Sequence, residues 1–202
     1  MDQILVTTVE KETSDTPFLI IDHKGIIGNE LYEKTNKELM TAFVSSKKPD
    51  RSANLIYIPY KHRIPEIPNG NYSIIIYVSD NEKDISEITK KCISKAKEDG
   101  IPFIFIVDKE SVGVQRLEPL LEKIVALYEE TYVIVLGEFF GQGDTLLDSY
   151  ILQAGTTRTI KLPHMGLRKT RPILFADAIQ GILQTIFGSQ KRQRITLLYL
   201  HH

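Results

Sequence analysis

The stretch Ile20-Ile-Asp-His-Lys-Gly-Ile-Ile-Gly-Asn-Glu-Leu31 joins an apolar run to a helical segment through a turn that contains Gly25 and Gly28. The apolar run, Phe18–Asp22, has the composition of a strand that is buried on both faces of a sheet. Gly25 permits a tight turn, and Gly28 lets a helix pack closely on the preceding strand. The stretch therefore predicts a strand–turn–helix unit of a parallel α/β sheet, with this strand in a central position.

The same alternation of strand and helix patterns continues along the chain. Further strands are expected at Leu39–Val44, Asn54–Tyr60, Tyr72–Val78, Phe103–Val107, Tyr132–Leu136, Arg158–Leu162, Pro172–Phe175 and Ile195–Leu200. Helices are expected at about Gly28–Thr35, Asp84–Asp99, Leu120–Glu130, Leu146–Gln153 and Ala176–Phe187. The pattern predicts an α/β protein with a Rossmann-like, mainly parallel sheet and helices on both faces.

Length and composition are those of one globular domain. The chain has 202 residues, of which 42% are hydrophobic and 25% charged, and its formal net charge is -1. We expect a single domain over residues 18–202, with residues 1–17 as an N-terminal extension or extra strand. The near-neutral charge favours neither nucleic acid nor an anionic membrane. Without a membrane-length apolar run or a signal-peptide pattern, we expect a cytoplasmic protein. The single cysteine, Cys92, is expected in the core.

The glycine turn also resembles a known fingerprint. Gly25 and Gly28 match the second and third glycines of a strand–Gly-x-x-Gly-x-x-Gly–helix pattern. Together with later segments such as Tyr132–Asp144 and Arg171–Gly181, the turn resembles the extended short-chain dehydrogenase/reductases, the NAD-dependent epimerase/dehydratase family. The resemblance covers roughly residues 18–198 and implies a Rossmann fold with a dinucleotide at the glycine turn.

Two positions depart from the dinucleotide-binding pattern. Asp22 stands where the family has its first glycine, so its carboxylate would face the pyrophosphate or would cap the following helix. Either arrangement blocks the cofactor. The second strand lacks the acidic residue that holds a ribose hydroxyl, and it is followed by Lys47 and Lys48, which could accept a 2′-phosphate or simply form a solvated loop. No cofactor is therefore expected.

The catalytic pattern is missing as well from its expected place between Asp108 and Lys123. The resemblance implies a Ser or Thr after the fifth strand and a Tyr-x-x-x-Lys pair on the next helix, which together move a proton. The tyrosine and lysine positions fall near Val114 and Glu118, and only Ser111 remains as a loop hydroxyl. Arg171 matches a family arginine that binds the diphosphate of a nucleotide-sugar, although a rim ion pair with Asp177 is an alternative. Family members extend further, so we expect a truncated substrate lobe.

Three functional hypotheses follow. The first is a non-catalytic, pseudo-epimerase or pseudo-reductase domain with a structural, regulatory or partner-binding role, alone or within a larger multidomain assembly. The second is a divergent NAD(P)-dependent reductase or sugar-nucleotide epimerase/dehydratase that uses other residues, such as Tyr60 or Tyr77. The third is a Mg²⁺ and phosphate site at Asp22, Asp80 and Asp108, each of which follows an expected strand. The first hypothesis is favoured, with no catalytic or metal-binding residue expected.

Overall fold

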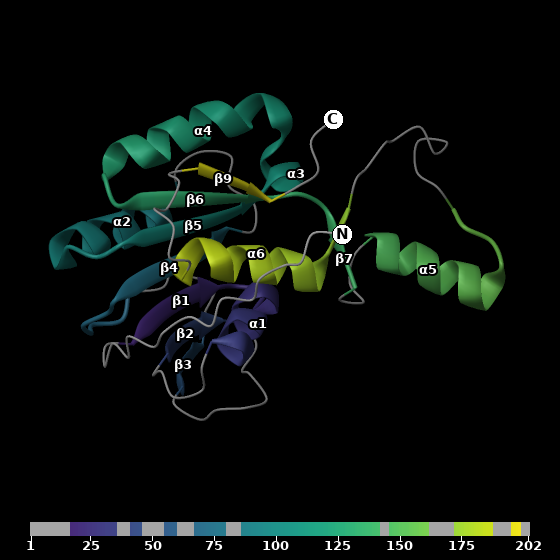
Figure 1. The fold of residues 1–202 in the computed structure, drawn as a ribbon, viewed down its shortest axis with the longest axis horizontal. Coiled ribbons are helices and arrows are strands. Elements are labelled where there is room, and N and C mark those ends of the chain that lie inside the picture. The colour runs from purple at the N-terminus through teal and green to yellow at the C-terminus, as the bar shows by residue number, and fades with distance from the viewer. Residues whose placement is uncertain are drawn as a thin grey trace, which may run out of the picture.

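A computed structural model describes residues 17–35, 41–45, 55–59, 67–79, 86–141, 146–161, 172–187 and 195–198. Its centre is a seven-stranded sheet of order β3-β2-β1-β4-β5-β6-β9 (Figure 1), and all neighbouring strands are parallel. The strands are β1 (Phe18–Asp22), β2 (Thr41–Ser45), β3 (Leu55–Pro59), β4 (Ile74–Ser79), β5 (Phe103–Asp108), β6 (Thr131–Leu136) and β9 (Ile195–Leu198). The Rossmann-like parallel sheet that the sequence predicts is confirmed.

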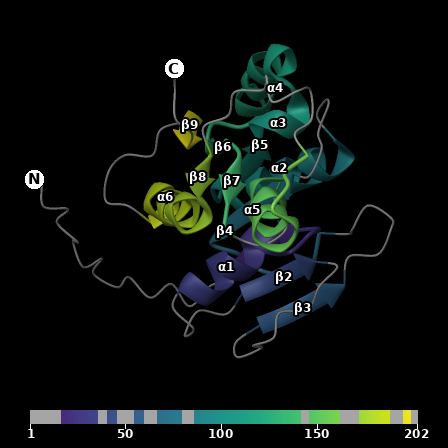
Figure 2. The ribbon, with the colours of Figure 1, turned by 90° about the vertical axis from the view of Figure 1, so that its right-hand side faces the viewer.

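Helices cover both faces of this sheet, also as predicted (Figures 1 and 2). They are α1 (Ile26–Lys34), α2 (Glu87–Asp99), α3 (Lys109–Val112), α4 (Val114–Leu127), α5 (Leu146–Thr157) and α6 (Phe175–Phe187). A small second sheet pairs β7 (Phe139–Phe140) with β8 (Ile173–Leu174). Figure 1 shows α5 standing away from the main sheet, beyond β7.

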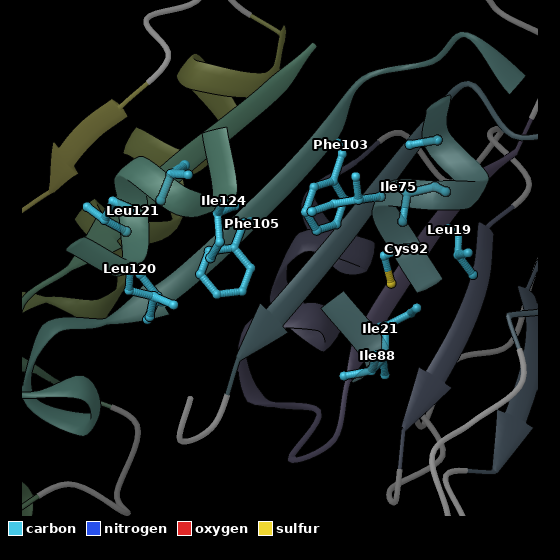
Figure 3. Packing of buried hydrophobic residues seen from close by; sticks show 14 of the residues in the cluster. Leu19, Ile21, Ile75, Ile88, Cys92, Phe103, Phe105, Leu120, Leu121 and Ile124 are labelled. Atoms are coloured by element: carbon cyan, nitrogen blue, oxygen red, sulfur yellow. The ribbon is translucent and has the colours of Figure 1, made fainter. Parts of the chain in front are cut away.

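One face of the sheet packs against α2, α3 and α4. Phe103 and Phe105 of β5 project into this layer and are fully buried, with Ile124 of α4 beside Phe105 (Figure 3). Cys92 of α2 is also fully buried among apolar side chains, which confirms the expected core position. Six to twelve neighbours surround a typical core residue, so this layer is sensitive to any change of side-chain volume.

The other face packs against α1 and α6. Their apolar side chains form a second cluster with Ile20 of β1, Ile104 of β5 and Ile134 of β6. The connections from β4 to β5, from β5 to β6 and from β6 to β9 all step across the sheet in one direction. Helices α2 and α4 make the first two connections on one face, whereas α6 lies in the third connection on the opposite face, beside α1. The α6 connection therefore has the opposite hand to those two crossovers, an exception to the usual rule. It brings α6 into contact with α1, the helix that follows the glycine turn.

Several element boundaries differ from the sequence-based expectations. Helix α4 begins at Val114 rather than Leu120 and contains Pro119, although proline normally disfavours a helix interior. The strand expected at Arg158–Leu162 is wrong for residues 158–161, which follow the longer α5 and include Arg158 at a φ of 54°. Of residues 1–17, the structure describes only Pro17, whose carbonyl accepts a hydrogen bond from the Ser73 amide.

Candidate functional site

The candidate site is the edge of the sheet at which β1 and β4 end. In the sheet, β2 lies next to β1 on one side, and β4 lies next to β1 on the other side and is followed by β5. The strand order therefore reverses between β1 and β4. Open parallel sheets bind ligands in the crevice outside the carboxyl ends of the strands at this point. The residues of interest are therefore those that end the strands, together with the turn into α1 (Figure 2).

Asp22 ends β1, and its carboxylate is turned toward the start of α1. The side chain is only 1% exposed. Oδ1 accepts a hydrogen bond of 2.9 Å from the Gly25 amide, and Oδ2 accepts one of 2.7 Å from the Gly28 amide. The first amides of a helix have no partner within the helix and carry partial positive charge. Asp22 therefore supplies an anion to the N-terminus of α1.

The local backbone explains why this contact forms. Gly25 precedes α1 in the left-handed region, with φ 73° and ψ 9°, and it has no side chain that could cap the helix. Glycine adopts this conformation without the steric cost that a side chain would impose. Gly28 lies on the buried face of α1, together with Leu31 and Tyr32. The predicted roles of both glycines, a tight turn and a close helix, fit these positions.

A second intramolecular contact lies at the end of β2. Ser45, the last residue of β2, is fully buried, and its carbonyl accepts a 2.9 Å hydrogen bond from the hydroxyl of Tyr57 in β3. In dinucleotide-binding sheets, an acidic side chain about 20 residues beyond the glycine turn binds the ribose hydroxyls. Ser45 lies at this position in the fold. Lys47 and Lys48 lie outside the described residues.

The other two strand ends carry a serine and an aspartate. Ser79 ends β4, is 4% exposed, and its hydroxyl has no hydrogen-bond partner within the described part of the chain. Asp108 ends β5, which lies two strands away from β1 in the sheet. The register aligns Asp22 with Ile106, so Asp108 lies two residues beyond the level of Asp22. Strand spacing and rise place the Cα atoms of the two aspartates roughly 12 Å apart. Asp80, the third acid of the magnesium hypothesis, lies outside the described residues.

Metal-ligating side chains do not gather in the ranges that the structure describes: no group of three or more His, Cys, Asp or Glu residues there could hold an ion. Arg171, the expected diphosphate ligand, lies just outside those ranges, whereas its alternative partner Asp177 is exposed in the first turn of α6. None of the described helices combines the length and the apolar composition that crossing a membrane requires.

The positions of the expected catalytic pair lie on α4. Val114 is the first residue of the helix, and Glu118 is exposed one turn later. Ser111 belongs to α3, a short helix that the sequence analysis missed. Tyr77, a candidate of the enzyme hypothesis, lies within β4 with its ring 5.8 Å from that of Phe105, in the layer that faces α2 and α4. Tyr60 lies outside the described residues.

Three tyrosines have perturbed acidities, all in the direction that opposes base catalysis. Burial raises the pKa of Tyr32, Tyr72 and Tyr128. Nearby carboxylates add to this, chiefly Glu33 for Tyr32 and Asp99 for Tyr72. A catalytic phenolate near neutral pH needs a lowered pKa. These three side chains are therefore unsuited to replace the missing tyrosine of the family.

Three solved structures have the same architecture. MoeE5 in complex with UDP-glucuronic acid and NAD aligns with a TM-score of 0.64 and 14% identity, over 90% of this chain and 75% of that chain. A putative NAD-dependent epimerase/dehydratase from Methylobacillus flagellatus aligns with a TM-score of 0.62 and 16% identity, over 94% and 77%. A short chain dehydrogenase family protein from Francisella tularensis subsp. tularensis SCHU S4 aligns with a TM-score of 0.54 and 15% identity, over 92% and 96%.

The fold is that of these dehydrogenases and epimerases. The resemblance that the glycine turn predicts is thus confirmed as a structural one, at low sequence identity. No protein-family model and no curated protein sequence matches the chain. Sequence reasoning missed the contact between Tyr57 and Ser45, because no local pattern links a tyrosine in one strand to a carbonyl twelve residues earlier.

Proposed function

We propose that this chain is a Rossmann-type domain that works without a dinucleotide, as a structural or partner-binding domain rather than as a catalyst. One observation carries the proposal: the Asp22 carboxylate accepts the Gly25 and Gly28 amides at the start of α1. Rossmann folds use such amides to bind the pyrophosphate of the cofactor. In this chain a covalently attached anion takes their hydrogen bonds.

Charge repulsion between Asp22 and a phosphate lowers the affinity of this place for a nucleotide. A phosphate that approaches the same amides meets the charge of Asp22 at a distance of a few ångströms. At about 4 Å and an effective dielectric constant near 20, two unit charges repel by roughly 4 kcal/mol. That is a loss of about a thousandfold in affinity. The side chain also fills the space that the first glycine of the fingerprint leaves open.

Two sets of exposed apolar side chains support a role in binding another protein. Helix α5 exposes Ile151 by 60% and Leu152 by 66%, and β9, the last strand of the sheet among the described residues, exposes Ile195 and Leu197 by 37% and 41%. Apolar surface that clusters on a protruding helix or on an open strand edge is typical of interaction sites. We therefore propose that the chain binds another protein through these side chains, either as a separate subunit or as part of a larger assembly.

A divergent NAD(P)-dependent enzyme is the second candidate. It is favoured by the fold that the chain shares with MoeE5, whose structure contains UDP-glucuronic acid and NAD. This function requires Asp22 to leave the α1 amides and a proton carrier other than the missing tyrosine–lysine pair. The magnesium hypothesis is disfavoured, because the amides at the start of a helix attract anions and repel a cation at Asp22.

Calorimetric titration with NAD⁺, NADH, NADP⁺ and NADPH tests the proposal. We expect the wild type to bind none of the four with useful affinity. Asp22→Gly restores the three-glycine spacing and removes the competing charge, so we expect it to gain weak binding of ADP or a dinucleotide. Asp177→Ala, which removes one exposed carboxylate elsewhere, is the matched control and should not gain binding.

Wild-type binding in the low micromolar range would overturn the proposal and support the enzyme. Binding by the wild type that Asp22→Gly abolishes would make Asp22 a ligand, as the magnesium hypothesis requires. If neither protein binds, a feature other than Asp22 closes the site, and the segment from Asp108 to Val114 becomes the next one to test.

A further inference from the structure

The end of β2 holds a second replacement of a nucleotide group. The Tyr57 hydroxyl donates a hydrogen bond of 2.9 Å to the Ser45 carbonyl. Register places Phe43 opposite both Ile20 and Tyr57, so Tyr57 lies on the same face of the sheet as Ile20, which packs in the α1 layer. Asp22 and Ser45 follow Ile20 and Phe43 by two residues and share that face, because alternate residues of a strand point the same way.

The two contacts lie within reach of one nucleotide. Ile21 pairs with Val44, so Asp22 and Ser45 are the next residues of two adjacent strands. Adjacent strands are about 4.8 Å apart. The Asp22 carboxylate at the end of β1 and the Tyr57 hydroxyl bound at the end of β2 are therefore spaced like neighbouring groups of one small molecule. In a dinucleotide-binding sheet, these two places hold the pyrophosphate and the ribose.

We infer that Tyr57 occupies the nucleoside half of the crevice as Asp22 occupies the phosphate half, so that the chain fills its own nucleotide site. The phenol replaces a ribose hydroxyl as the donor to the Ser45 carbonyl, and the carboxylate replaces a phosphate as the acceptor of the α1 amides. Ser45 is fully buried, so no part of its side chain is open to a ligand. This inference rests on the proposed function and extends it to a second residue.

Three probes distinguish the phosphate half of the site from the nucleoside half. Inorganic pyrophosphate reports the phosphate half alone, adenosine reports the nucleoside half alone, and ADP reports both. Each is titrated calorimetrically into the wild type, Asp22→Gly, Tyr57→Phe and the double variant. Tyr57→Phe removes only the hydroxyl and keeps the ring, so it leaves the packing of β3 intact. Tyr72→Phe is the matched control, because the Tyr72 hydroxyl also donates to a backbone carbonyl, that of Pro68, at 3.0 Å.

We expect Tyr57→Phe, added to Asp22→Gly, to tighten ADP binding about threefold to tenfold, the effect of one freed hydrogen-bond acceptor. Pyrophosphate binding should change less than about twofold, and Tyr72→Phe should change neither. An equal effect of Tyr57→Phe on ADP and pyrophosphate, or none on either, overturns the assignment of Tyr57.

The adenosine titrations test the role of Tyr57 independently of the role of Asp22. If Asp22→Gly binds no pyrophosphate, the role of Asp22 in the proposed function is refuted, but Tyr57→Phe should still bind adenosine more tightly than the wild type does. Adenosine affinity that is the same in both proteins would refute the inference about Tyr57 in that case.

Discussion

Replacing Asp22 with alanine removes the acceptor of two amides at the start of α1, so it should destabilise the fold markedly. Hydrogen bonds to a charged group contribute about 1.5–3 kcal/mol each, and a buried amide left without a partner costs about 1–3 kcal/mol. Water entering the emptied space would recover part of this loss. We therefore expect Asp22→Ala to lower the free energy of unfolding by roughly 2–4 kcal/mol in total.

The size of the chain converts this loss into a temperature. A domain of 150–250 residues loses about 2–4 °C of Tm for each kcal/mol. A loss of 3 kcal/mol then corresponds to a fall of roughly 6–12 °C. Urea denaturation, followed by circular dichroism with an unchanged m-value, gives the same quantity at constant temperature.

Two further variants separate the hydrogen bonds from general helix electrostatics. Asp22→Asn keeps the shape and one acceptor but turns an N–H group toward the second amide, so its stability should lie between those of Asp22→Ala and the wild type. Asp177→Ala removes an exposed carboxylate from the first turn of α6. It should cost no more than about 1 kcal/mol. Equal stability of Asp22→Ala and Asp177→Ala would mean that the Asp22 carboxylate does not stabilise the start of α1.

Four other substitutions test the packing and the acidity of Tyr72. Gly28→Val should lose roughly 1–3 kcal/mol by overpacking α1 on β1, and an unchanged Tm would contradict the close packing. Ile151→Lys on the exposed face of α5 should stay within about 0.5 kcal/mol of the wild type, whereas Ile182→Ala in the buried face of α6 should lose about 2–5 kcal/mol; similar losses would mean that α5 belongs to the core. Because the pKa of Tyr72 is raised in the folded state, its contribution is present below about pH 10 and is lost as the pH rises further. Tyr72→Phe should therefore lose less stability than the wild type between urea titrations at about pH 8 and about pH 10.5; equal losses would exclude this tyrosine as the cause.

The sequence by itself determined the parallel sheet and the replaced positions of the glycine turn. Strands such as Phe18–Asp22 and Phe103–Asp108 are buried on both faces, so their continuous apolar runs are visible without any tertiary information. The amphipathic pattern of Glu87–Asp99 and the glycine that follows it are equally local. That no Tyr-x-x-x-Lys occurs between Asp108 and Lys123 is read directly from the identities of the residues.

Local patterns failed where one residue type is compatible with two structures. Pro119 precedes the helix predicted at Leu120–Glu130, yet it lies inside α4, with the buried side chains of Leu117 and Leu120 on either side of it. The helix predicted to end at Gln153 continues to Thr157 in α5. The Thr157 hydroxyl donates a hydrogen bond to the Gln153 carbonyl in this last turn, a contact that the sequence pattern does not show.

Only the tertiary structure decided where the Asp22 carboxylate and the Tyr57 hydroxyl lie. The sequence left two places for the Asp22 carboxylate, facing a pyrophosphate or capping the helix, and the structure places it on the Gly25 and Gly28 amides. The contact of Tyr57 with Ser45 joins two strands through their register and has no counterpart in a sequence pattern. Residues distant along the chain become neighbours only when hydrogen bonding between strands sets their alignment, because a shift of one residue would turn each side chain to the opposite face.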